Sequence, residues 1–475
     1  MQRLSALDAT FLEVEDAVSH MNIASIALFE GPPPKPEELH EMVLAKLALV
    51  PRYRQVVRFV PFSAGRPVWV DDPHFNLEYH LRHSALPAPG CEQQLHMMIG
   101  RVMSQQLDRC KPLWEMWAVE GLELPGEPDG WALISKIHHC MVDGVAGADL
   151  LSIMLDPAPD TPHASPPRWT ASPPPGEAEL LARALATAAA APLQALRGLR
   201  APRALAERGR DATRGLMRMR DVATPTPGCS LNGPLGAHRR WSCARAELSD
   251  VRKVKATLGG TVNDIVLACI TGGFRDLLHA RHESVQRTIR TMVPVSVRMP
   301  AEHGDYDNRV SAIFAELPVG IADPVARLDS IRAQMADLKA SHEADAGEML
   351  TSLAGFAPPL LLALAERAAT HIPQHNVNTV TTNVPGPQQP LYAAGRRMLE
   401  AFGYVPLGGH IRIGVAIFSY NGHLGFGITG DYDSAPDIDV LSAGIETALA
   451  QLLAVCASRR PARAQGRRSG YTHVI

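Results

Sequence analysis

The chain of 475 residues is long enough to bury cores in two or three domains, which excludes a small fold stapled by disulfides. Hydrophobic residues make up 46% and charged residues 20%, the usage of a folded globular protein rather than of a disordered or fibrous one. The formal net charge of −3 gives no global basic field for wrapping a nucleic acid, so an anionic partner has to be bound locally.

The first part of the chain, up to about residue 155, alternates strand and helix patterns. Acidic residues interrupt the first 20 positions, where an export signal needs an apolar core, and the apolar stretches are far shorter than the roughly 20 residues that span a bilayer. We therefore expect a cytoplasmic protein without a transmembrane helix, peripherally associated with a membrane or lipid bodies. The patterns predict strands over 22–30, 67–70, 77–81, 114–119 and 131–138, and helices over 35–50, 92–107 and 145–155.

Residues 156–230 differ from the regions on either side and are predicted to form a linker. Eight prolines lie between Asp156 and Pro175, and proline lacks the backbone N–H that a packed element needs. Between Leu193 and Arg220, eight arginines stand against two acidic residues, with apolar residues between them. This composition is typical of a helix on an anionic membrane surface, but a solvated linker helix is the more frequent case.

The second part of the chain, residues 231–460, has a similar order of elements. Its patterns predict helices over 261–278, 326–338 and 437–455, and strands over 288–297, 310–317, 376–382, 411–419 and 424–429. The basic tail, residues 461–475, is expected to be disordered. The sequence thus predicts two domains, 1–155 and 231–460, joined by the linker.

The densest group of reactive side chains is SKIHHCMVDG, residues 135–144, between a strand pattern and a helix pattern. His138 and His139 end the strand, where an imidazole can point into a cleft and abstract a proton near neutral pH. Asp143 can fix the imidazole tautomer or the loop, and Gly144 supplies the turn into the helix. An arbitrary pair of histidines is more often part of a core, but the Asp-Gly at this spacing favours a catalytic site.

The spacing HHxxxDG resembles the active-site motif of the CoA-dependent acyltransferase superfamily. Further blocks are similar to one of its families, the bacterial wax ester synthase/diacylglycerol acyltransferases, and the resemblance covers about residues 1–455. These blocks are LSALDATF (4–11) with MNI (21–23), GRPVWV (65–70), LPAPG (86–90), LDRCKPLWE (107–115), LNGPL (231–235) with Arg239, TVND (261–264), NVPGP (383–387) and SYNG (419–422). The resemblance implies an α/β (α+β) fold of two chloramphenicol-acetyltransferase-like domains, each a mixed sheet with flanking helices, and an active-site channel between them.

The resemblance also implies that His139 is the general base and that Asp143 is mainly structural. The chemistry agrees, because an alcohol is too weak an acid to attack a thioester unaided and a positioned imidazole contributes roughly 10²–10⁴-fold. His138 is expected to support the site rather than to catalyse. From spacing and resemblance, Arg239 is expected to bind Asp143, and Asn263 or a backbone N–H to stabilise the oxyanion.

Six residues are further candidates for substrate binding, each with a structural alternative. Asn263 and Asp264 begin a predicted apolar helix, where helix capping explains them equally well. Pro112 and Trp114 more often mark the start of a strand with a core tryptophan. Asn383 and Pro385 belong to a rigid turn, which the resemblance places at the border of the substrate tunnel.

Other chemistries find little support in the sequence. Cys140 as a nucleophile activated by His139 is disfavoured, because adjacent residues on a strand point apart. There is no GxSxG motif, and GFGITG at 425–430 is followed by DYDSAP rather than by a helix, which indicates a glycine-bearing strand and not a nucleotide site. The seven cysteines have neither CxxC nor zinc-ligand spacing, so neither a metal nor a cofactor is expected.

We therefore expect an O-acyltransferase that moves a long-chain acyl group from acyl-CoA, its co-substrate, to diacylglycerol and to long-chain alcohols, through a ternary complex. Besides these substrates, the expected partner is an anionic membrane or lipid-droplet surface, and not a nucleic acid. Two alternatives stay open: a related acyltransferase with a polyketide or glycolipid hydroxyl as acceptor, and a non-catalytic lipid-body protein. The intact HHxxxDG argues against the second, because a coat protein needs no base beside an aspartate.

Overall fold

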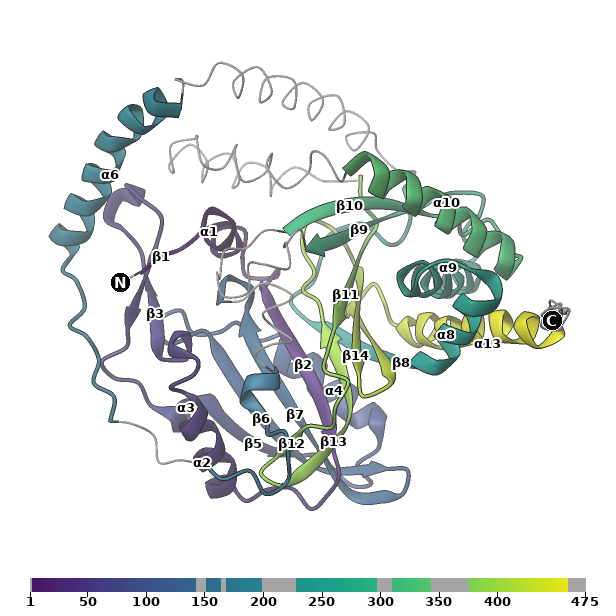
Figure 1. Ribbon diagram of the computed structural model, residues 1–475, viewed down its shortest axis with the longest axis horizontal. Coiled ribbons are helices and arrows are strands. Elements are labelled where there is room, and N and C mark those ends of the chain that lie inside the picture. Colours follow the sequence, from purple (N-terminus) through teal and green to yellow (C-terminus); the bar gives the residue numbers. More distant parts are fainter. Residues whose placement is uncertain are drawn as a thin grey trace, which may run out of the picture.

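The computed structural model describes residues 2–141, 151–163, 168–198, 228–296, 310–342 and 376–459. Two six-stranded mixed sheets form its framework, with helices against them and a small three-stranded sheet at one edge (Figure 1). The mixed α/β class predicted from the sequence is confirmed. The predicted tail, residues 461–475, and most of the basic stretch 193–220 lie outside the described residues.

The first sheet carries the histidine pair at the end of one of its central strands. Its strands are antiparallel except for one parallel pair, β5–β6. In spatial order they are β12 (Tyr392–Ala393), β13 (Arg396–Tyr404), β2 (Asn22–Phe29), β7 (Glu127–His138), β6 (Trp114–Leu124) and β5 (Leu81–Ala85).

Each face of this sheet has its own apolar core, as the alternation of side chains along a strand requires. On one face, Leu133 of β7 packs with residues of α1 (Ala6–Glu13) and α2 (Pro36–Lys46). On the other face, Ile134 packs with residues of α4 (Glu92–Met103). Both faces of the strand β7 are therefore buried, and this packing holds the end of the strand in position.

The second sheet belongs to the C-terminal part of the chain. Two parallel pairings, β11–β14 and β11–β9, make it a mixed sheet, and its remaining pairs are antiparallel. In spatial order its strands are β10 (Val310–Leu317), β9 (Ile289–Ser296), β11 (Thr379–Pro385), β14 (Ile413–Tyr420), β15 (His423–Asp431) and β8 (Arg239–Glu247). The helices α8 (Leu248–Leu258), α9 (Val262–Ala280), α10 (Pro324–His342) and α13 (Ile438–Ser458) gather beside it (Figure 1).

The two sheets are joined by chain exchange and by close contact. Strands β12 and β13 come from the C-terminal half but pair into the first sheet, through β13 and β2. The glycine-bearing stretch 425–430 lies in β15, as predicted, and its glycines let β13 approach closely. A Cβ on Gly427 would lie 1.8 Å from the carbonyl oxygen of Gly403. Glycine is needed here because only a residue without a side chain leaves room for the neighbouring backbone.

The small sheet pairs the N-terminus with a hairpin. Its strands are β1 (Gln2–Arg3), β4 (Val68–Asp71) and β3 (Gln55–Arg58). The turns η1 (Pro51–Arg54) and η2 (Pro61–Ser63) flank β3, and the helix α6 (Glu177–Gly198), within the predicted linker, packs beside it. Figure 1 places this sheet and α6 at the opposite end of the molecule from α8 and α13.

Most predicted elements agree with the structure to within a few residues, but the strand predicted over 77–81 is wrong. Residues Leu77–His80 form the single helical turn α3, and β5 begins only at Leu81. The side chain of Asn76 explains the turn, because its Oδ1 accepts the backbone N–H of Glu78 and caps the helix. The strands β1, β3, β8, β12 and β13 and the helix α8 were not predicted. Most of the helix predicted over 145–155 lies outside the described residues.

One helix of the described residues, α13, is long and apolar enough to span a membrane by length and composition. Its residues Leu441, Ile445 and Leu452 are buried in the same core as residues of α9. A helix buried in a protein core has the same apolar composition as a membrane span, so the burial of α13 accounts for its composition.

Candidate active site

His139 lies directly after β7, in the short turn η3 (His139–Met141). Its backbone N–H donates to the carbonyl oxygen of Met21, over 2.8 Å. Its half-buried ring stacks on Phe11 of α1, with 4.0 Å between the ring centroids and 20° between the planes. The backbone hydrogen bond to Met21 and the stacking on Phe11 thus position the imidazole of His139. Asp143 and Gly144 lie outside the described residues, so their roles stay predictions.

His138 is buried, with 1% of its surface exposed. Its Nδ1 accepts the backbone N–H of Cys140 over 3.1 Å, so the hydrogen of the neutral ring sits on Nε2. This bond closes the turn that carries His139, which supports the predicted supporting role. The Cys140 thiol is also buried, and burial raises its pKa well above the ordinary value, as an unreactive thiol requires.

A buried carboxylate that the sequence pattern does not single out lies beside His138. Oε2 of Glu15 is 3.5 Å from His138 Nε2, and the side chain of Glu15 is 1% exposed. Arg109 donates to the same oxygen from Nε and Nη2, over 3.0 and 2.6 Å, and its Nη2 also donates to the carbonyl oxygen of Leu12. Burial alone would raise the pKa of Glu15, but His138 and Arg109 lower it to about 2. The carboxylate is therefore ionised at neutral pH and fixes His138.

A second buried charge, Lys136, supports the same strand on the α4 side. Its Nζ donates to the carbonyl oxygens of Val102 and Gln105, over 2.9 and 2.5 Å, at the C-terminal end of α4. A cation there satisfies carbonyl groups that the helix leaves free and complements the helix dipole. Burial lowers the pKa of Lys136 to about 8. The end of β7 is thus tied to α4 as well as to α1.

The segment around Pro112 and Trp114 lies in the core beside the histidines. Trp114 is fully buried between the rings of Tyr53 and His80, with 4.4 Å between centroids in both pairs, and its Nε1 donates to the carbonyl oxygen of Tyr53. The predicted binding role of Trp114 is therefore corrected to a core role, and Pro112 is buried beside it. Leu113, between them, accepts the backbone N–H of His138 over 2.9 Å.

Two of the predicted binding residues, Asn263 and Asn383, meet in the structure. The Nδ2 of Asn383, on β11, donates to Oδ1 of Asn263, near the start of α9, over 3.3 Å, and both residues are half-buried. Asp264 is buried and caps α9, because its Oδ2 accepts the N–H of Thr261 while the Thr261 hydroxyl accepts the N–H of Asp264. Pro385 ends β11 and is exposed.

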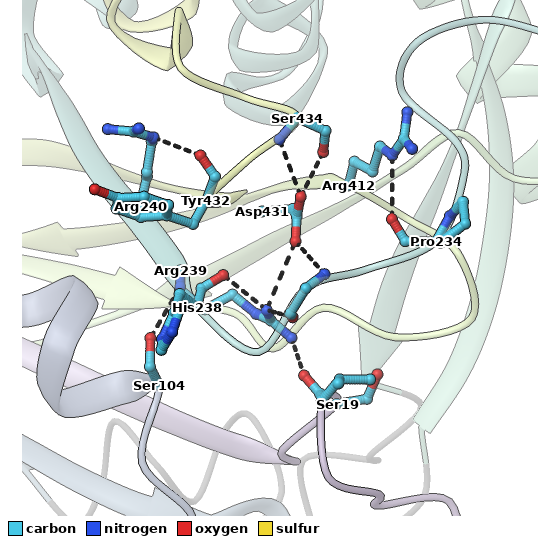
Figure 2. A network of polar contacts seen from close by, with 12 residues as sticks. Ser19, Ser104, Pro234, His238, Arg239, Arg240, Arg412, Asp431, Tyr432 and Ser434 are labelled. Carbon is cyan, nitrogen blue, oxygen red and sulfur yellow. Dashed lines mark hydrogen bonds and ion pairs between the residues drawn. The ribbon is translucent and has the colours of Figure 1, made fainter.

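Arg239 lies at the seam between the two halves and is 5% exposed (Figure 2). Its guanidinium donates to the carbonyl oxygens of Gly236, His238 and Val18 and lies 3.9 Å from Oδ1 of Asp431. Its backbone N–H donates to the hydroxyl of Ser104 over 2.9 Å. Asp431 is thus a carboxylate partner of Arg239 that the sequence pattern does not indicate. The pairing with Asp143 stays a prediction.

Among the described residues, one group has the composition of a metal site: Glu92 and His96 of α4 with Cys243 of β8, whose ligand atoms lie within 4.8 Å of one another. Arg245 donates to the same Oε1 of Glu92 and lies 3.5 Å from the Cys243 sulfur. Its guanidinium already supplies the positive charge at this place, and burial raises the pKa of the Cys243 thiol. We therefore interpret the group as an ion-pair cluster between α4 and β8.

A small, mostly apolar cavity of about 20 Å³ lies beside β7 on the face that packs against α2. Its lining includes Leu133 and Ile137 of β7 and three methionines, Met42, Met116 and Met154. Ile137 precedes His139 by two residues, so this lining approaches the turn of His139. Flexible methionine side chains can adapt to chains of different shape.

Comparison with known proteins gives consistent matches over the chain. The model of the wax ester synthase/diacylglycerol acyltransferase catalytic domain matches residues 4–266, and the model of the WS/DGAT C-terminal domain matches residues 306–453. A probable diacylglycerol O-acyltransferase of Mycobacterium tuberculosis is 36% identical over 469 residues, which cover 98% of this chain and 99% of the relative. A putative diacylglycerol O-acyltransferase of the same species is 32% identical over 477 residues, covering 97% of this chain and 92% of the relative.

Solved structures show the same architecture. The wax ester synthase/diacylglycerol acyltransferase from Marinobacter aquaeolei is 25% identical, with a TM-score of 0.67 over 96% of this chain and 100% of that one. The starter condensation domain of rhizomide synthetase, solved in complex with C8-CoA and Leu-SNAC, is 15% identical with a TM-score of 0.57, over 96% of this chain and 94% of that one. This second likeness concerns the fold alone.

Proposed function

Because the chain belongs to the wax ester synthase/diacylglycerol acyltransferase family, and is thus an acyltransferase, we propose that it transfers a long-chain acyl group from acyl-CoA to the free hydroxyl of diacylglycerol. The product is triacylglycerol, and long-chain alcohols are the second acceptor class, giving wax esters. The observation that carries the proposal is the turn after β7, where His139 is held by Met21 and Phe11 and braced by the buried pair of His138 and Glu15.

In the proposed reaction, His139 takes the proton of the acceptor hydroxyl as the oxygen attacks the thioester carbonyl. A C–O bond forms, and the carbonyl electrons move to an oxyanion, for which the neighbouring amides of Asn263 and Asn383 are the candidate donors. When the oxyanion collapses, the C–S bond breaks and His139 returns the proton to the CoA thiolate. Since the thioester is already activated, a base and an oxyanion donor suffice, and we propose that the enzyme uses no metal or redox cofactor.

Two features support a long acyl chain and a CoA donor. The small cavity beside β7 has an apolar lining, and its flexible methionines would have to move aside to admit an acyl chain. The condensation domain solved with C8-CoA shares the fold. We therefore propose that the acyl chain lies along β7 while the thioester reaches His139.

The proposed function is tested by CoA release from palmitoyl-CoA in the presence of diacylglycerol, hexadecanol or short alcohols. The wild-type chain should release CoA with diacylglycerol and form triacylglycerol, and His139→Ala should lower the rate by at least about 10²-fold while the protein stays folded. Near-normal turnover by this variant would contradict the mechanism. Turnover only with other hydroxyls would favour the acyltransferase with a different acceptor, and lipid binding without CoA release on any acceptor would favour the non-catalytic lipid-body protein.

A further inference from the structure

The hairpin between β3 and β4 presents aromatic side chains to the solvent. Phe62 is 88% exposed and Phe59 is 47% exposed, and Phe62 is the most exposed large hydrophobic residue among those that the structure describes. Single exposed leucines or methionines are common on soluble proteins, but two phenylalanines three residues apart at one hairpin tip form a local apolar surface. Such an exposed apolar surface is typical of a site that binds a partner.

The backbone at this tip holds the rings outwards. Phe62 and Ser63 have φ angles of 59° and 50°, in the left-handed region that a bulky residue seldom adopts. Two turn hydrogen bonds fix this conformation, from Ser63 to Val60 and from Ala64 to Pro61, each over 3.2 Å, and Val60 is buried below them. The exposure of Phe62 is therefore built into the turn and is not the result of a loose loop.

The helix α6 extends the same surface. Its buried residues Leu180 and Ala184 dock it on the hairpin, where Leu180 joins the cluster of Val56, Val68 and Val70 and Ala184 lies against Gly65. Leu185, the next residue, is 57% exposed. Figure 1 shows α6 running alongside the hairpin at the edge of the molecule. We call Phe59, Phe62 and Leu185 the hairpin patch.

The charge of the hairpin indicates the kind of partner. Residues 51–71 contain four arginines against one acidic residue, Asp71. Arg58 is exposed and Arg52 and Arg66 are half-buried, whereas Arg54 is buried and stacks on Trp169, so it is not available to a partner. Arg58 directly precedes Phe59. Apolar rings next to arginines match a membrane surface that contains anionic lipids, because the rings enter the boundary of the acyl chains while the arginines pair with headgroups.

The hairpin is also close to the candidate active site. Arg3 of β1 pairs with Val68 of β4, and the chain then enters α1, where Phe11 stacks on His139. Three residues of extended chain and five residues of helix place the Cα atoms of Arg3 and Phe11 no more than about 18 Å apart. The N-terminal segment thus connects the hairpin with the helix that holds His139.

We propose that the hairpin patch docks the protein on a phospholipid bilayer containing anionic lipids, and that this brings His139 to an acceptor dissolved in the membrane. The docking stands on the patch and its charge, whereas its use for the acceptor rests on the proposed function. The same surface would be the first part of the enzyme to meet diacylglycerol, which resides in a bilayer.

The test compares binding of the full chain to vesicles of phosphatidylcholine, with and without phosphatidylglycerol. The double variant Phe59→Ser, Phe62→Ser should lower the partition coefficient on the anionic vesicles about tenfold. Arg58→Gln should lower it about fivefold on these vesicles and leave binding to pure phosphatidylcholine unchanged. The matched control is Met97→Ser, on α4, which removes another side chain that is 65% exposed and should change neither.

Activity separates this inference from the proposed function. With short water-soluble alcohols the double variant should keep the wild-type rate of CoA release, whereas with diacylglycerol in anionic vesicles its rate should fall about tenfold, in step with binding. Equal vesicle binding by the double variant and the wild type would overturn the inference. So would a variant that changes only the oligomeric state, measured as the molecular mass in sedimentation, because the patch would then be an interface between protein chains. If no CoA is released with any acceptor, the proposed function fails, and the vesicle experiment still tests whether the hairpin patch binds the membrane.

Discussion

At the scale of single residues, the buried carboxylate of Glu15 constrains the candidate site most. It holds Arg109 on one side and His138 on the other, and His138 in turn closes the turn of His139. A buried carboxylate is tolerated when it is paired in this way, and removing a partner leaves the other charge uncompensated. Glu15 is therefore a positioning residue: it acts on His139 only through His138.

The pH dependence of stability tests this role. The pKa of Glu15 is about 2 in the folded protein against an ordinary value of 4.5, so ionisation stabilises the fold fully above pH 4.5 and progressively less as the pH falls towards 2. We expect Glu15→Gln to lower the free energy of unfolding by about 3 kcal/mol at pH 7, and by about 1 kcal/mol less at pH 3.5. Urea unfolding followed by tryptophan fluorescence measures both values, and a difference independent of pH would contradict the assignment.

The sequence predicts the reactive histidines but not their supports. The spacing of His138, His139 and Asp143 marks them locally. The contacts of Glu15 with His138 and of Phe11 with His139, in contrast, join segments that are far apart in the chain, and nothing in the local pattern of Glu15 distinguishes it from a solvated acid. Trp114 shows that a motif residue can have a structural place, because it fills the core, as the structural alternative in the sequence predicts.

At the scale of elements, amphipathic periodicity predicts α2 and α4, whereas β2 and β7 are predicted from runs of apolar and β-branched residues. Periodicity does not reveal β13, since a bulge between Met398 and Glu400 shifts the register of this strand and interrupts its alternation of period two. Its place in the first sheet, next to β2, also depends on a pairing between distant parts of the chain. Local pattern carries no information on such a pairing.

The contact between β13 and β15 leads to a prediction about Gly427. A methyl group there would meet the Gly403 carbonyl oxygen, a backbone atom that cannot swing aside, at 1.8 Å. We expect Gly427→Ala to lower the free energy of unfolding by at least about 3 kcal/mol, or to prevent folding. Gly176→Ala is the control, because nothing lies within 4 Å of its Cβ position, and it should change stability by less than about 0.5 kcal/mol. Thermal unfolding of both variants checks this, and equal midpoints would refute the close approach.

At the scale of the whole molecule, the two halves are coupled at Arg239. The guanidinium, from the start of β8, donates to the carbonyl oxygen of Val18, in the loop between α1 and β2. Three residues later, Met21 accepts the backbone N–H of His139. The C-terminal half thus holds the loop that positions the candidate base, which gives a physical reason why neither half alone would hold a complete site.

Arg239→Met should therefore affect both stability and turnover, but for different reasons. Stability should fall by about 3–5 kcal/mol, because three carbonyl oxygens lose their buried donor and Asp431 loses a nearby cation, and adding Asp431→Asn should restore only the second, smaller part of this loss. The rate of CoA release should stay about tenfold below wild type in both variants, because the Val18 loop is no longer held. Arg281→Met is the matched control: it breaks a pair with Asp437 inside the C-terminal half, so it should cost stability and leave the rate unchanged. If the double variant regained the full rate, the coupling would act only through stability, and the loop would need no anchor from the other half.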